Sequence, residues 1–208
     1  MIKKYSLIIG LGLIIGASGL ASCSKTSDFL GVWTSTTPED ITTSVPAASS
    51  ATSLVSISFV EGTGKNDGGS VALTSIINVN QPVTGSPMSM NQPYEVNVAA
   101  TASLGGTWIY EEGSDDDLLL SLDLSTLKVN VDNNGVTFTQ NMLTGAQQPQ
   151  IDSLTTVTAE LWKNQLTQAM TKEFSRFKKL DDVKVHKGQV LTFEIQNPEL
   201  TLQMRKTE

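Results

Sequence analysis

The fold is decided by the stretch Leu54-Val55-Ser56-Ile57-Ser58-Phe59, in which apolar side chains alternate with serine. A period of two puts the apolar side chains on one face of a β-strand and the polar ones on the other. Such a strand is half-buried and needs neighbouring strands with the same alternation to complete its sheet. The stretch therefore predicts one strand of an antiparallel sheet.

The same alternation recurs outward from this stretch, first beyond a glycine-rich turn at 62–69. Its apolar positions are Val71, Leu73, Ile77 and Val79; Tyr94, Val96, Val98 and Ala100; Leu118, Leu120 and Leu122; Leu127, Val129 and Val131; Val136 and Phe138; Val183 and Val185; Leu191, Phe193 and Ile195; and Leu200, Leu202 and Met204. Asn134-Gly135 between two such segments predicts a type I′ hairpin over 126–140. Gly105-Gly106 predicts a break, and 34–53 reads as a long loop rich in Ser, Thr, Pro and Ala. The count is about ten short strands.

The period changes once, near residues 153–179. The apolar positions there are three to five residues apart: Leu154, Val157, Leu161, Trp162, Leu166, Met170, Phe174 and Phe177. This stripe predicts one long amphipathic α-helix, with Asp152 or Ser153 at its N-cap. Many short antiparallel strands avoid exposed edges by closing on themselves. We therefore expect a mainly β fold, an antiparallel β-barrel of about eight to ten strands, with the helix over a barrel end or along its side.

The N-terminus has the order of an export signal: Lys3 and Lys4, the apolar run 7–20, and then small residues. Leu20-Ala21-Ser22-Cys23 resembles the lipobox of bacterial lipoproteins, in which the cysteine is acylated and becomes the first mature residue. An ordinary cleaved signal and an uncleaved anchor are the alternatives. Cys23 is the only cysteine, which favours lipid attachment. The expected organisation is a signal peptide over 1–22, a lipidated tether over 23–28 and one domain over 29–208.

Charge excludes some partners. Removal of Lys3 and Lys4 with the signal lowers the 14 Lys and Arg side chains to 12, against 21 Asp and Glu, which gives −9. Such a balance argues against nucleic acid as a partner. We expect the protein to be held on the outer membrane by lipid. In lipoproteins of Bacteroidetes-type bacteria, which the lipobox-like end resembles, an acidic run after the cysteine accompanies display on the cell surface. The absence of such a run after Cys23 therefore favours the periplasmic face.

The mature chain resembles the lipocalin-like (calycin-like) domain of Bacteroidetes-type lipoproteins. The resemblance rests on Gly31-Val32-Trp33 after the tether, the alternating strands, the late helix and a last strand that ends in Arg205. It implies that Trp33 plugs one barrel end and that Arg205 stacks on it. The helix departs from the family's pattern because it precedes the last three strands. Trp108, in a second Gly-Thr-Trp, leaves open a two-part chain, although one shared core is the better interpretation.

Residues for chemistry are scarce. His186 lies beside a predicted turn without a second histidine or a free cysteine, so it reads as a solvated turn residue. Asp115, Asp116 and Asp117 are weak candidates for a Ca²⁺ site, and a solvated hairpin loop is the alternative. No catalytic motif and no cofactor site is recognised. We expect a non-enzymatic binding module for a small apolar or amphipathic ligand. The alternative is an assembly lipoprotein that docks a protein partner on its helix face.

Overall fold

The computed structural model describes residues 26–63, 68–83, 94–111, 114, 116–139, 147–197 and 199–207. Its α-helices are α1 (Thr26–Phe29) and α2 (Gln148–Ser175), and its 3₁₀ turns are η1 (Thr42–Ser44), η2 (Leu124–Thr126), η3 (Asn133–Gly135) and η5 (Arg176–Lys178). The strands are β1 (Gly31–Ser35), β2 (Glu39–Asp40), β3 (Ser50–Glu61), β4 (Gly68–Val83), β5 (Tyr94–Tyr110), β6 (Leu118–Leu122), β7 (Lys128–Asn130), β8 (Val136–Phe138), β9 (Lys179–His186), β10 (Val190–Ile195) and β11 (Leu200–Thr207).

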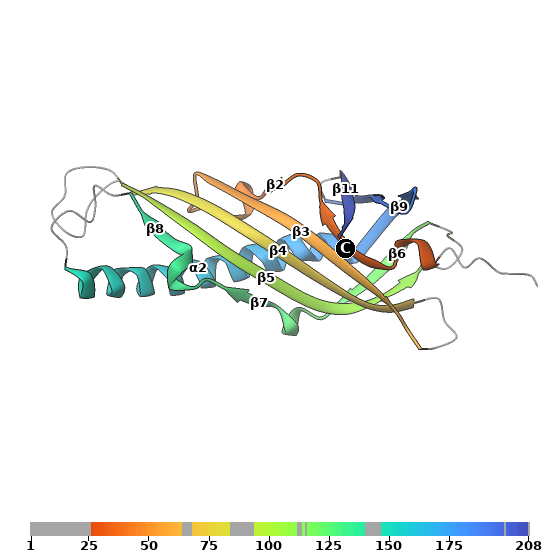
Figure 1. Cartoon of the computed structure of the whole chain (residues 1–208), viewed down its shortest axis with the longest axis horizontal. Coiled ribbons are helices and arrows are strands. Elements are labelled where there is room, and N and C mark those ends of the chain that lie inside the picture. Colours follow the sequence, from red (N-terminus) through yellow and green to blue (C-terminus); the bar gives the residue numbers. More distant parts are fainter. Residues whose placement is uncertain are drawn as a thin grey trace, which may run out of the picture.

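All strands belong to one antiparallel sheet in which eight of them form a ring. The sheet runs in the order β1-β11-β10-β9-β6-β5-β4-β3, and β1 also pairs with β3. Strands β3, β4 and β5 extend far beyond this ring and form a long sheet of their own, while β2, β7 and β8 add to its edges (Figure 1). The mainly β, antiparallel architecture with one long helix is confirmed.

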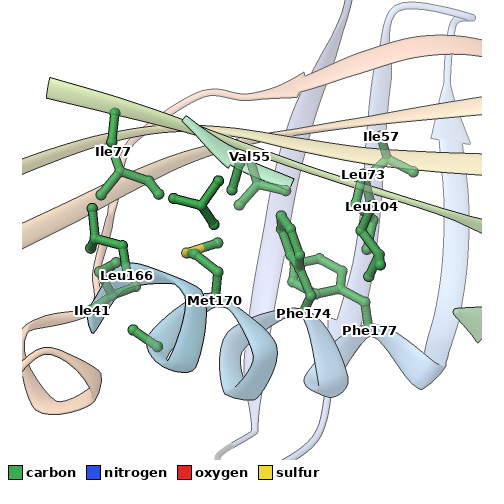
Figure 2. Close-up of a cluster of buried hydrophobic side chains, with 14 of the residues drawn as sticks. Ile41, Val55, Ile57, Leu73, Ile77, Leu104, Leu166, Met170, Phe174 and Phe177 are labelled. Carbon is green, nitrogen blue, oxygen red and sulfur yellow. The ribbon is translucent and has the colours of Figure 1, made fainter. Parts of the chain in front are cut away.

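The core lies between the long sheet and α2. Buried and exposed residues alternate along β3, as its sequence pattern predicts. Figure 2 shows Val55 and Ile77 on the sheet side facing Leu166, Met170 and Phe174 of the helix. Of the two expected positions, a barrel end or the side, the helix therefore lies along the side of the long strands (Figure 1).

Helix α2 begins five residues earlier than predicted, and the N-cap prediction of Asp152 or Ser153 is wrong. The N-cap is Gln147, whose backbone N–H donates to Oε1 of Gln150 at 3.1 Å. A proline stands in the first turn, where its missing N–H costs nothing. Asp152 instead lies inside the helix and accepts a hydrogen bond from Nε2 of Gln148 at 2.8 Å. The sequence pattern missed this start because the residues of the first turn are mostly polar and do not extend the apolar stripe.

The predicted stripe of α2 is correct over its C-terminal half and wrong at two N-terminal positions. Val157 and Leu161 are 65% and 53% exposed. Thr155 and Ala159 are buried in their place, because small side chains on that face let the helix approach the sheet. Among the described residues, no helix is both long and apolar enough to span a membrane.

The hairpin predicted over 126–140 is wrong. Strands β7 and β8 both pair with β5, at 101–103 and 96–98, and so continue the edge that β6 begins. Asn133–Gly135 forms the 3₁₀ turn η3, closed by the Asp132 side chain, which accepts from the Gly135 N–H at 2.8 Å. The long edge of β5 thus provides both segments with backbone partners, and the tight turn is not needed.

Two further local predictions are wrong. Strand β5 continues through Gly105-Gly106, because β4 supplies paired residues along its whole length. The segment 34–53 also holds more structure than a loop, since β1 reaches Ser35, β2 and η1 follow, and β3 begins at Ser50.

Candidate functional site

Trp33 and Trp108 belong to one core, as expected. Both are fully buried, and Nε1 of Trp33 donates to the Phe29 carbonyl at 2.6 Å. The Phe29 ring meets the Trp108 and Phe59 rings edge-on, with centroids 5.0 and 5.2 Å away. This end of the ring is filled by aromatic side chains, and the alternative of a two-part chain is not supported.

Lys206, rather than Arg205, covers Trp33. Trp33 and Lys206 are cross-strand partners, and Nζ of Lys206 lies 5.3 Å from the centroid of the Trp33 ring. Arg205 pairs with Thr34 and faces the other side of the strand, because side chains alternate. The expected cation over Trp33 is present, one residue later than predicted. Gly31, the other structural candidate, has a φ of 117°, which favours glycine.

Acidic side chains of the loop before β6 form an ion-pair cluster around Lys179, together with Asp181 of β9. Nζ of Lys179 lies 2.7 Å from Glu111, 3.0 Å from Asp181 and 3.4 Å from Asp117. Of the three metal candidates, Asp115 lies outside the described residues. The described part of the chain contains no group of three His, Cys, Asp or Glu residues suited to a metal ion. The weak Ca²⁺ candidates Asp116 and Asp117 therefore gain no support.

His186 ends β9, where it is exposed and its Nε2 lies 3.3 Å from Oγ1 of Thr192. This position agrees with a solvated residue beside a turn. Cys23, the expected lipid attachment, lies outside the described residues.

A pocket lies at the end of the ring opposite Phe29 and has a volume of about 640 Å³. Its walls are the end of β1 and the turn after it (35–38), β2 and η1 (39–44), the last turns of α2 (172–176), and β11 with the turn before it (197–203). Most of the lining residues are hydroxyl, amide or charged residues, and Leu200 and Leu202 add an apolar strip. Pockets of this size accommodate small organic ligands.

Three charged side chains form the base of this pocket. The exposed fractions of the Glu39, Glu173 and Arg176 side chains are 11%, 10% and 13%. Nη1 of Arg176 lies 2.8 Å from Oε2 of Glu173 and 4.0 Å from Oε2 of Glu39. The other oxygen of Glu173 accepts a hydrogen bond from the Ser44 hydroxyl. One guanidinium thus lies between two carboxylates, and Glu173 has the closer contact.

Glu39 is the less satisfied of the two carboxylates. Its Oε1 atom is buried and has no hydrogen-bond partner among the described residues. The pKa of the Glu39 carboxyl is raised above its ordinary value of 4.5, mainly because burial disfavours the charged form. The Arg176 guanidinium opposes this shift, and the neighbouring Glu173 charge adds to it. Glu39 therefore contributes negative charge to the pocket wall, while its Oε1 atom is itself shielded from solvent.

Sequence reasoning missed this site. Glu173 falls on the predicted helix stripe, three residues after Met170 and directly before Phe174. A charged residue at such a position is a detectable signal, because a buried carboxylate requires a partner. Glu39 follows Pro38 in a segment expected to be a loop and carries no comparable signal.

No known protein family matches the chain, and no curated protein shows significant similarity to it.

Proposed function

We propose that this protein is a lipid-anchored lipoprotein of the cell envelope that binds a small ligand in the pocket above Glu39. The export signal and lipobox-like end at Cys23 support the anchor. The pocket supports the binding role, since four acidic side chains line it against two basic ones. This excess of acidic lining is the observation that carries the proposal.

The pocket favours an amphipathic ligand with a cationic or hydroxyl donor group. Its lining includes the acidic side chains Glu39, Asp40, Glu173 and Glu199, against Lys172 and Arg176. A cationic group in the pocket is attracted to these carboxylates and can form charge-assisted hydrogen bonds with their exposed oxygen atoms. The apolar strip of Leu200 and Leu202 can cover a short hydrocarbon part. A small ligand with an amino group next to a polar or aliphatic skeleton fits this chemistry.

The anchor is tested with Cys23→Ala. Acyl chains supply the membrane affinity, and two or more of them hold a protein stably on a bilayer. We expect the variant to leave the membrane fraction and to keep the unfolding midpoint of the parent. Retention in the membrane fraction would contradict lipid attachment.

The ligand site is tested by ligand-observed NMR with glucosamine, N-acetylglucosamine and spermidine. We expect the two amines to bind the parent protein and the neutral acetylated sugar to bind more weakly. Glu39→Gln, which removes the negative charge, should weaken amine binding about tenfold or more, since hydrogen bonds to charged groups contribute about 1.5–3 kcal/mol. Glu160→Gln is the matched control, because Glu160 lies on the exposed face of α2. Equal effects of the two substitutions would contradict the proposal.

Docking of a protein partner on α2 is the second candidate. Exposed Val157 and Leu161, one turn apart on the outer face, favour it. Trp162 and Phe174, which a larger docking face would need, are buried in the core. Cross-linking in the native host from residue 161, compared with residue 164 on the same exposed face, tests this role.

A further inference from the structure

Four apolar side chains lie on the outer face of the sheet near the end that carries α1. Val32, Val60 and Ile109 are 41%, 55% and 50% exposed, and Leu119 is half-buried. They stand on β1, β3, β5 and β6, near the ends of these strands that α1 adjoins (Figure 1). We call this set the apolar collar.

The strand register brings the members of the collar together. Val32 pairs with Ser58, so it lies diagonally across from Val60. Ile109 pairs directly with Leu119. Val60 and Ile109 are separated only by β4, where the small residues Gly68 and Ser70 are their partners. The collar is therefore a band around this end of the sheet and not a set of scattered positions.

The remaining outer face of the long strands has a different composition. Its exposed positions are mostly small or polar: Ala72, Thr74, Asn78, Asn97, Ala99 and Thr101. The large apolar exceptions are Ile76, 54% exposed and six residues along β4 from Ser70, and its half-buried partner Leu54. At about 3.3 Å per residue, Ile76 lies roughly 20 Å from the collar.

The tether enters the fold at the same end. Phe29 is buried against Phe59 and Trp108, and its carbonyl accepts the hydrogen bond of Trp33. Phe29 is six positions after Cys23, a span of at most roughly 20 Å. A lipid on Cys23 would hold this end of the domain close to the bilayer.

We propose that the apolar collar rests on the lipid surface and that the pocket above Glu39 opens away from it. This inference rests on the lipid anchor proposed above. Strand β1 runs from Gly31, beside the tether, to Ser35 in the pocket wall. Strand β11 returns from Leu200 in that wall to Thr207, next to Val32. The ligand would therefore enter from the aqueous side, about the length of β11 from the membrane.

The test uses full-length lipidated protein in phosphatidylcholine vesicles whose acyl chains carry bromine, a contact quencher of tryptophan. Val60→Trp and Ile109→Trp place the reporter in the collar, and Ile76→Trp is the control on the same outer face. The native Trp33, Trp108 and Trp162 are fully buried and give a common background. We expect a blue shift and a loss of the added emission for the two collar variants, and emission without either change for Ile76→Trp.

The outcomes separate the collar from the anchor. Protein that floats with the vesicles but shows equal quenching at positions 60, 109 and 76, or none, overturns the collar. Protein that does not float with the vesicles overturns the anchor, and the collar's role with it. Because all three positions are exposed, a tryptophan is accommodated there without disturbing the core, and the thermal midpoint of each variant checks this.

Discussion

Lys206 and Trp33 face one another as direct partners on β11 and β1, with the Lys206 Nζ atom 5.3 Å from the centroid of the Trp33 ring. Leu202 and Met204 are buried on the same face of β11, so Lys206 is the residue at which this face reaches solvent. A cation over an aromatic face is attracted by the negative potential of the ring. The lysine thus covers the outermost buried tryptophan of the ring.

Replacing this cation should have a small, specific effect. We expect Lys206→Met to lower the free energy of unfolding by about 0.5–1 kcal/mol, the range of a cation–π contact at an exposed site. Arg205→Met, on the opposite face of the same strand, should stay within about 0.5 kcal/mol of the parent. Urea denaturation of the two variants measures the difference. A larger loss for Arg205→Met would contradict the assignment.

This pair also shows what the sequence can and cannot predict about the strands. Alternation determines which residues of a strand share a face, and it correctly indicated the buried positions of β3, β4 and β10. The partner of Trp33 depends on the register between β1 and β11, which are more than 160 residues apart. No local pattern contains that register, so the choice between Arg205 and Lys206 required the fold.

The errors elsewhere have the same origin. Asn134-Gly135 is compatible with a tight hairpin, but the free edge of β5 offered both flanking segments a longer partner. The pocket depends on Glu39 and Glu173, which are 134 positions apart and meet through Arg176. Of these two residues, only Glu173 could be recognised from the sequence, because it is a charged residue within an apolar helix stripe.

The two neighbours Leu161 and Trp162 should differ sharply when truncated. Trp162 is 1% exposed in the core, so Trp162→Ala should cost about 3–5 kcal/mol of unfolding free energy. Leu161 is 53% exposed, and Leu161→Ala should change the free energy by at most about 0.5 kcal/mol. Chemical denaturation distinguishes the two. Similar losses would contradict the placement of Trp162 in the core and of Leu161 on the outer face of α2.

Gly69 should not tolerate a side chain, because the Trp108 indole occupies the space beside it. A Cβ atom at Gly69 would overlap the Val60 carbonyl oxygen and lie 2.9 Å from Nε1 of Trp108. The same indole nitrogen donates to that carbonyl at 3.1 Å. We expect Gly69→Ala to cost about 1–3 kcal/mol, as overpacking does. Gly105→Ala is the control, since its nearest neighbour would be 3.6 Å away, and a calorimetric comparison that ranked it as more damaging would refute this packing.

Glu39 should make stability depend on pH. Because its folded pKa lies above the ordinary 4.5, the ionised carboxylate is disfavoured in the folded state. Its contribution to stability is therefore lost as the pH rises from about 4.5 through the folded pKa. We expect Glu39→Gln to be more stable than the parent at pH 7 and to lose that advantage below pH 4.5. Denaturation curves over this range measure the crossing, and a variant that is less stable at pH 7 would contradict it.

Among the described residues, two pairs close the ring between β6 and β9, Leu118 with Leu180 and Leu119 with Lys179. Polar contacts extend this seam. The Asp182 N–H donates to Oδ1 of Asp117 at 3.0 Å, and the next amide, Val183, donates to the Asp116 carbonyl at 2.8 Å. The pKa of Asp117 is lowered, mainly by the bond from Asp182. The seam therefore depends on the side chains that surround Lys179.

Removal of Lys179 should loosen this seam before any other part of the ring. Hydrogen bonds that the Lys179 ammonium donates to Glu111 and Asp181 raise the pKa of Lys179 above its ordinary 10.5, so its stabilising charge is fully present at neutral pH and lost only at strongly alkaline pH. In Lys179→Met the carboxylates of Glu111, Asp117 and Asp181 would repel one another without a counter-ion. We expect faster hydrogen exchange at the amides of Asp182 and Val183.

Salt should change this exchange in opposite directions in the two proteins. In Lys179→Met salt should slow the exchange, because it screens the repulsion between the carboxylates. In the parent salt should speed the exchange, because it screens the attraction between Lys179 and the carboxylates. Lys184→Met, which removes the exposed ion pair with Asp182, is the control and should leave the Val183 amide protected. Equal exchange in both variants would show that Lys179 does not hold the seam.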